Sequence, residues 1–89
     1  ISPYRDSRAF VRSQCRHFIE VYVKASLEEC KRRDVKGLYK KAMDGRISSF
    51  TGVDDPYEEP QQADIVVDTE TQTIEESVQQ ILDYLKPYL

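Results

Sequence analysis

The stretch Phe18-Ile19-Glu20-Val21-Tyr22-Val23 gives the clearest indication of the fold. It is a nearly continuous run of β-branched and aromatic residues, interrupted by one acid, as expected of a strand covered on both faces in a parallel sheet. A second short run of this kind spans residues 64–69. Because strands that alternate with helices form parallel sheets, the two runs predict an α/β fold.

Helical patterns surround both predicted strands. Asp6-Ser7 can cap a basic helix that ends at Cys15, before the first strand. After that strand, Ser26 and Glu29 form a capping box for a helix over residues 27–33.

Three further elements follow in the second half of the chain. We expect a helix over residues 35–43 that ends near Gly45, then a long loop over residues 48–62. After the second strand, Thr73 caps an amphipathic helix. Its apolar positions follow the 3.6-residue period at Ile74, Val78, Ile81, Leu82, Leu85 and Leu89.

This order of elements predicts a three-layer α/β/α sandwich around a parallel sheet. Two strands cannot complete such a sheet, because both of its edges would be open. The chain also begins at Ile1 without an initiator Met. We therefore expect residues 1–89 to be a fragment, with more chain before Ile1 or another molecule supplying the rest of the sheet.

Composition and charge narrow the function. With 89 residues and 39% hydrophobic content, the chain is at most one domain. The formal charge of -3 argues against a nucleic-acid binder, which needs a basic surface. No apolar run approaches the roughly 18 residues of a membrane span. Cys15 and Cys30 are expected to be buried free thiols.

The cations are concentrated in the first half of the chain, where eleven of the thirteen lie between Arg5 and Lys41. The densest group contains Arg32, Arg33, Lys36, Lys40 and Lys41. On one continuous helix Arg33, Lys36 and Lys40 would share a face that could grip phosphate or sulfate oxygens. The alternative is a solvated helix face. Gly37 favours a bend or a close ligand approach at this point.

Several polar and aromatic residues outside the helices are candidates for ligand contact. Phe50, in the long loop, could stack on a purine or anchor the loop to the core. Ser2 is a candidate ligand contact rather than a nucleophile, because His17, the only histidine, shows no sign of pairing with it. The acids between residues 54 and 59 lack the spacing of a calcium loop and suggest a polar lid.

Two long motifs resemble those of the adenylylsulfate kinases (APS kinases). They are Arg33-Asp34-Val35-Lys36-Gly37-Leu38-Tyr39-Lys40-Lys41-Ala42 and Phe50-Thr51-Gly52-Val53-Asp54-Asp55-Pro56-Tyr57-Glu58, supported by Ile1-Ser2-Pro3-Tyr4 and the segments 18–21 and 75–78. The resemblance is to the C-terminal half of these kinases and covers essentially the whole chain. It implies a P-loop kinase fold, of which the chain would be an incomplete C-terminal half. It also implies transfer of the ATP γ-phosphate to the 3′-hydroxyl of adenosine 5′-phosphosulfate (APS), which gives the sulfate donor PAPS.

The resemblance also assigns roles to individual residues. Residues 34–62 would be the substrate helix and lid. The implied substrate contacts are Ile1 and Ser2 at the phosphosulfate, Lys36 at its anionic group, and Ser49 and Phe50 at the adenine. Ser2 is also the position of a candidate phosphoserine intermediate in this family. Arg33 would face the ATP phosphates, and Gln72 would lie near the ATP.

One part of the family pattern is missing from the sequence. A P-loop kinase holds the ATP phosphates and Mg²⁺ with G-x-x-x-x-G-K-[ST], and Gly37, Gly45 and Gly52 do not form that motif. ATP with Mg²⁺ would therefore be bound mainly by an N-terminal portion, with no metal ligand here, and the 89 residues alone are expected to be inactive.

The resemblance further implies a cytoplasmic homodimer, either standing alone or fused to an ATP sulfurylase. Two other functions stay open at this point. One is a catalytically inactive interaction or anion-binding domain, which the basic group of residues 32–41 would suit. The other is a different nucleotide kinase with a similar lid.

Overall fold

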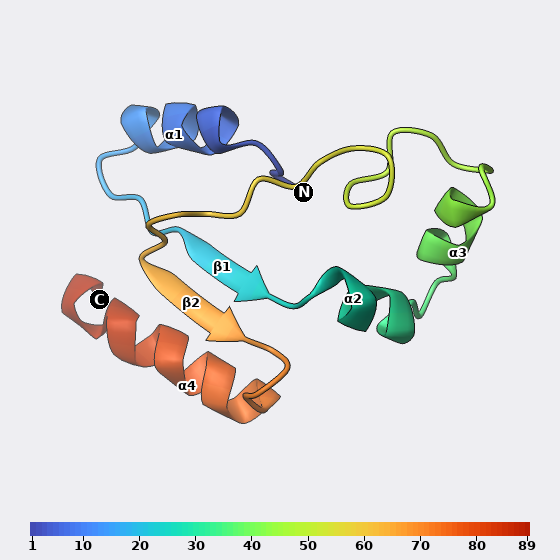
Figure 1. The fold of residues 1–89 in the computed structure, drawn as a ribbon. Coiled ribbons are helices and arrows are strands. Elements are labelled where there is room, and N and C mark those ends of the chain that lie inside the picture. The colour runs from blue at the N-terminus through green and yellow to red at the C-terminus, as the bar shows by residue number, and fades with distance from the viewer. The chain divides into compact units, whose positions relative to one another are not determined.

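The computed structural model describes residues 1–89, which divide into two compact units (Figure 1). The sheet unit comprises residues 19–25 and 61–89. The helical unit comprises residues 1–18 and 26–60. No helix is both long and apolar enough to cross a membrane.

The sheet unit is built on two parallel strands, β1 (Val21–Lys24) and β2 (Ile65–Asp68). Their arrows point the same way in Figure 1, and the register pairs Val21 with Ile65 and Lys24 with Asp68. Helix α4 (Ile74–Leu85) packs along β2, and the short 3₁₀ helix η1 (Lys86–Tyr88) follows it. The predicted parallel pairing of the two apolar runs is confirmed.

Strand β1 begins three residues later than the apolar run that predicts it. The backbone N–H of Glu20 donates to the Asp64 carboxylate at 2.7 Å. The Glu20 carbonyl in turn accepts the N–H of Ile65 at 3.0 Å. A side chain thus takes the place of one backbone partner at the start of the ladder, so regular strand geometry begins only at Val21.

Burial alternates along β2, contrary to the expectation of strands covered on both faces. Ile65 and Val67 are 3% and 2% exposed, whereas Val66 between them is 44% exposed. Successive side chains of a strand point to opposite faces of the sheet. One face of β2 therefore packs into the core, and the other face is only partly covered.

Helix α4 begins where the sequence predicts. The Thr73 hydroxyl accepts the Glu76 N–H at 3.1 Å, and the Glu76 carboxylate accepts the Thr73 N–H at 2.9 Å, which completes a capping box. These bonds hold the pKa of Glu76 below its usual value. The apolar stripe is less buried than its periodicity suggests, since Ile74 is 80% exposed.

The helical unit contains α1 (Arg5–Gln14), α2 (Leu27–Arg33) and α3 (Leu38–Met43). The predicted cap of α1 at Asp6-Ser7 is wrong, because Tyr4 occupies the N-cap position. The Arg5 N–H instead donates to the Glu58 carboxylate at 2.8 Å. The first turn of α1 is thus capped by a residue that is distant in sequence, which local patterns cannot reveal.

The prediction of one helix over residues 35–43 is also wrong at its start. Gly37 has a φ of +67° and is the N-cap of α3, so Lys36 lies in the turn between α2 and α3. A left-handed residue at this point ends any continuous helix, and glycine adopts it without steric cost. The predicted stop near Gly45 is confirmed, as is the long stretch without regular helix or strand that follows it.

Replacing Thr73 with Ala in the full-length protein should lower the free energy of unfolding by about 1 kcal/mol, because one N-terminal donor of α4 loses its acceptor. Urea denaturation measures the loss. Thr71→Ala is the matched control, because the contact of its hydroxyl with the Asp68 carbonyl is long, at 3.4 Å. Equal effects of the two substitutions would contradict a capping role.

Candidate functional site

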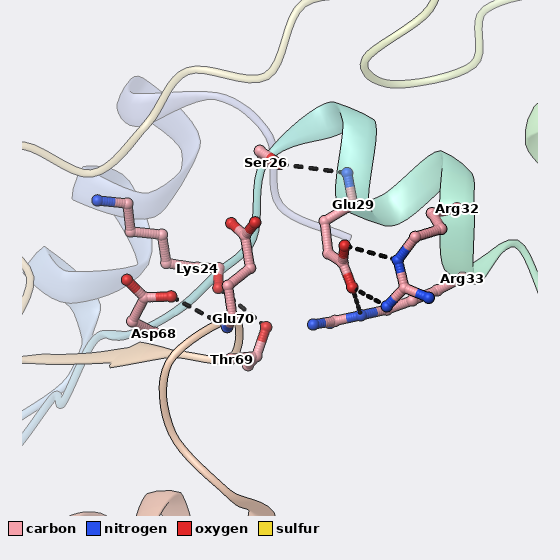
Figure 2. Close-up of polar contacts among 8 residues, drawn as sticks. All are labelled: Lys24, Ser26, Glu29, Arg32, Arg33, Asp68, Thr69 and Glu70. Carbon is pink, nitrogen blue, oxygen red and sulfur yellow. Dashed lines mark hydrogen bonds and ion pairs between the residues drawn. The ribbon is translucent and has the colours of Figure 1, made fainter.

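Arg33 lies at the end of α2, next to an acid that holds it (Figure 2). The Glu29 carboxylate accepts a hydrogen bond from Nε of Arg33 at 2.9 Å and another from Nε of Arg32 at 2.8 Å. The hydrogen bond from Arg32, with that from Arg33, lowers the pKa of Glu29 to about 2. The Ser26 hydroxyl accepts the Glu29 N–H at 3.2 Å, so the predicted start of this helix is confirmed.

The turn that carries Lys36 is held by Asp34. Its carboxylate accepts the backbone N–H of Tyr39 at 3.0 Å and that of Lys40 at 3.2 Å. The Asp34 carbonyl accepts the N–H of Gly37 at 2.9 Å. Asp34 therefore closes the turn and caps α3 at the same time, and Lys36 is exposed within it.

The predicted cationic face of Arg33, Lys36 and Lys40 on one helix is wrong. Arg33 belongs to α2, Lys36 to the turn and Lys40 to α3. The three residues cannot follow the 3.6-residue period, because α2 ends at Arg33 and α3 begins only after Gly37. An anion bound by these three cations would contact side chains from three separate elements.

The segment around Ser49 and Phe50 is a compact turn rather than an open loop. The Asp54 carboxylate accepts the Ser49 N–H at 2.6 Å and also the Phe50 N–H. The Phe50 carbonyl accepts the N–H groups of Val53, Asp54 and Asp55, each at 3.1 Å. Ser49 adopts a φ of +54°, which the bond to Asp54 helps to hold.

The Phe50 ring is fixed against α3. Its centroid lies 4.9 Å from that of Tyr39, with an angle of 73° between the ring planes. Burial, together with the neighbouring Cys30, raises the pKa of Tyr39. Of the two roles considered for Phe50, the structure shows the anchoring contact, and an edge-to-face pair occupies at most one face of the Phe50 ring.

Ser2 lies in the segment before α1. Its carbonyl accepts a hydrogen bond from Nη1 of Arg8 at 2.7 Å, and its side chain is exposed. Next to it, the Pro3 carbonyl accepts the Glu58 N–H at 2.7 Å. Ile1 is 96% exposed, so contacts of the residues that follow it hold this segment in place.

Gln72 lies in the sheet unit, beyond the carboxyl end of β2. Its side-chain oxygen accepts the Asp68 N–H at 2.7 Å, and its side-chain nitrogen donates to Gln80 at 2.7 Å. Both ends of the amide therefore organise the turn between β2 and α4. At the same edge, Thr69 donates to the Lys24 carbonyl and Glu70 donates through its N–H to Asp68 (Figure 2).

Most of the predicted site residues belong to one unit. The helical unit holds Ile1, Ser2, Arg33, Lys36, Ser49 and Phe50, and the sheet unit holds Gln72. The sequence patterns missed the acids that fix the backbone around them, Asp34, Asp54 and Glu58. Asp34 and Asp54 each lie near a glycine in a turn, a signal that could have suggested side-chain caps. No group of three or more metal-ligating side chains converges in the structure.

Asp54→Ala should loosen the turn at Ser49 and Phe50, because both N–H groups lose a charged acceptor. Amide hydrogen exchange of these two residues should accelerate about tenfold or more, since such bonds contribute about 1.5–3 kcal/mol. Asp55→Ala is the matched control, because only the backbone of Asp55 has hydrogen bonds in this turn. Unchanged exchange in Asp54→Ala would show that the turn does not depend on the carboxylate.

Comparisons with known proteins agree with the motifs. The family model of adenylylsulphate kinase matches residues 1–68. The chain is 59% identical to an adenylyl-sulfate kinase of Oceanobacillus iheyensis, over 97% of this chain and 44% of that protein. It is 53% identical to one of Staphylococcus epidermidis, over 99% of this chain and 45% of that protein.

A solved structure gives the same result for the fold. The APS kinase of Mycobacterium tuberculosis in complex with AMPPNP and APS superposes with a TM-score of 0.92 and is 39% identical. The match covers 97% of this chain and 51% of that one, so the chain spans about half the length of the relatives it matches. The predicted α/β class is thereby confirmed as part of a P-loop kinase fold. The chain belongs to the adenylylsulphate kinase family.

Proposed function

We propose that this chain is the C-terminal portion of an APS kinase domain. The complete domain would transfer the γ-phosphate of ATP to the 3′-hydroxyl of APS and release PAPS. Residues 34–62 would form the substrate helix and lid. One observation carries the proposal: the turn of Lys36 and the turn of Phe50 belong to one unit and are joined through the contact of Tyr39 with Phe50.

The chemistry of these turns suits APS. Lys36 offers an exposed ammonium, which attracts a phosphosulfate group. Phe50 has one ring face that Tyr39 does not occupy, and a purine can stack on such a face. Ser49 precedes it with a backbone fixed by Asp54. A cation and an aromatic ring on two braced turns match a ligand with an anionic end and an aromatic end.

Other residues of the family pattern would serve the two reacting groups. Ile1 and Ser2 would contact the phosphosulfate. We assign Ser2 to ligand contact, because in-line transfer from ATP requires positioning and charge stabilisation rather than a covalent intermediate. Arg33 would face the ATP phosphates, and Glu29 would hold its guanidinium in place through Nε.

ATP and Mg²⁺ would be bound mainly outside these 89 residues. The sequence has no G-x-x-x-x-G-K-[ST] motif, which supplies phosphate and Mg²⁺ contacts in P-loop kinases. We therefore assign only Arg33 and the segment at Gln72 to ATP, and we expect the chain on its own to be inactive.

Lys36→Ala in the full-length protein should raise KM for APS at least about tenfold, with a smaller change in KM for ATP, because a charged contact contributes about 1.5–3 kcal/mol. Steady-state assays with each substrate varied in turn measure both constants. Lys41→Ala is the matched control, since Lys41 is an exposed lysine of α3. Unchanged KM and kcat in Lys36→Ala would remove Lys36 from the site.

The same assay distinguishes the competing functions. Phosphorylation of another nucleoside acceptor in preference to APS would favour a different nucleotide kinase with a similar lid. Absence of any transfer, with binding of APS detected by calorimetry, would favour an inactive anion-binding domain. A cytoplasmic homodimer, with or without a fused ATP sulfurylase, remains part of the proposal, and light scattering of the full-length protein tests the dimer.

A further inference from the structure

We infer that Arg8 is a positioning residue for APS, which fastens the segment of Ile1 and Ser2 to the far end of the lid. The choice of APS as the substrate rests on the proposed function. The contacts of Arg8 do not depend on that function, because they lie within the helical unit. Arg8 is outside the motifs that carry the resemblance.

The guanidinium of Arg8 bridges two backbone segments. Its Nη1 donates to the Ser2 carbonyl at 2.7 Å, and its Nη2 donates to the Glu58 carbonyl. The carbon of the guanidinium lies 5.8 Å from the centroid of the Tyr57 ring. A planar guanidinium can serve two carbonyls at once in fixed directions, whereas an ammonium is a point charge on a flexible stem.

Three further bonds join the same two segments. The Glu58 N–H donates to the Pro3 carbonyl at 2.7 Å. The Glu58 carboxylate accepts the Arg5 N–H at 2.8 Å, and Nε of Arg5 donates to the Glu59 carbonyl at 2.9 Å. Residues 2–5 and 58–59 are therefore cross-linked by hydrogen bonds although about fifty positions separate them. Arg8 lies outside both segments, and its side chain donates hydrogen bonds to each of them.

This link matters because each segment adjoins proposed APS contacts. Ile1 and Ser2 lie at the start of the first linked segment, and Ser49 and Phe50 lie in the same long loop as Glu58. If Arg8 is lost, Ile1 and Ser2 must be ordered when APS binds, and ordering a residue costs about 1–2 kcal/mol of conformational entropy. The cost falls on APS binding, since the segment that Arg8 holds carries two of the proposed APS contacts.

The experiment compares Arg8→Met and Arg8→Lys with the wild-type full-length protein. Both variants should raise KM for APS about tenfold, leave KM for ATP within about twofold, and accelerate amide exchange at Glu58. Arg8→Lys keeps the charge, so a mere attraction of the anion by Arg8 predicts normal KM in that variant. Arg12→Lys is the matched control, because Arg12 lies one turn along α1 over the ring of Phe18.

Each outcome decides the inference. Normal KM for APS in Arg8→Met, or restoration by Arg8→Lys, overturns the positioning role. Equal rises in both KM values with a matching loss of thermal stability overturn it too, because they indicate general unfolding. An inactive wild-type protein overturns the proposed function instead. In that case exchange at Glu58 alone tests the link, and an unchanged rate in Arg8→Met refutes it.

Discussion

The parallel pairing of β1 with β2 is the constraint on which the rest of the chain depends. The ladder runs from Val21 and Ile65 to Lys24 and Asp68, and the Thr69 N–H extends it by donating to the Lys24 carbonyl at 3.0 Å. It closes an excursion of the chain over residues 25–64, which contains Arg33, Lys36 and Phe50. Closing a long excursion is entropically unfavourable, and buried apolar residues such as Val67 offset that cost.

Within the helical unit, carboxylates fix the backbone around the proposed ligand contacts. Asp34 caps α3, Asp54 holds the Ser49 turn, and Glu58 caps α1, each by accepting backbone N–H groups. The chain carries a formal charge of -3. Several of its acids are engaged by the backbone, while Lys36 is exposed.

The same bonds distinguish the residues proposed to contact a substrate from the residues that hold them in position. Lys36 and Phe50 are the proposed APS contacts, but neither fixes its own position. Their turns depend on Asp34, Asp54 and Tyr39, and the opening segment depends on Arg8. Substitutions at the supporting residues should therefore act on substrate affinity through the conformational entropy of the site.

The sequence by itself determined the α/β class, the start of α2 at Ser26, the cap of α4 at Thr73 and the family, because these depend on local pattern and on long specific motifs. Local patterns failed wherever a distant side chain or an unusual φ intervened. The start of α1 is set by Glu58, that of β1 by Asp64, and the helix expected over residues 35–43 is broken at Gly37. Only the tertiary structure decided that Phe50 packs on Tyr39 and that Arg8 joins Ser2 to Glu58, since such contacts arise when segments far apart in sequence meet.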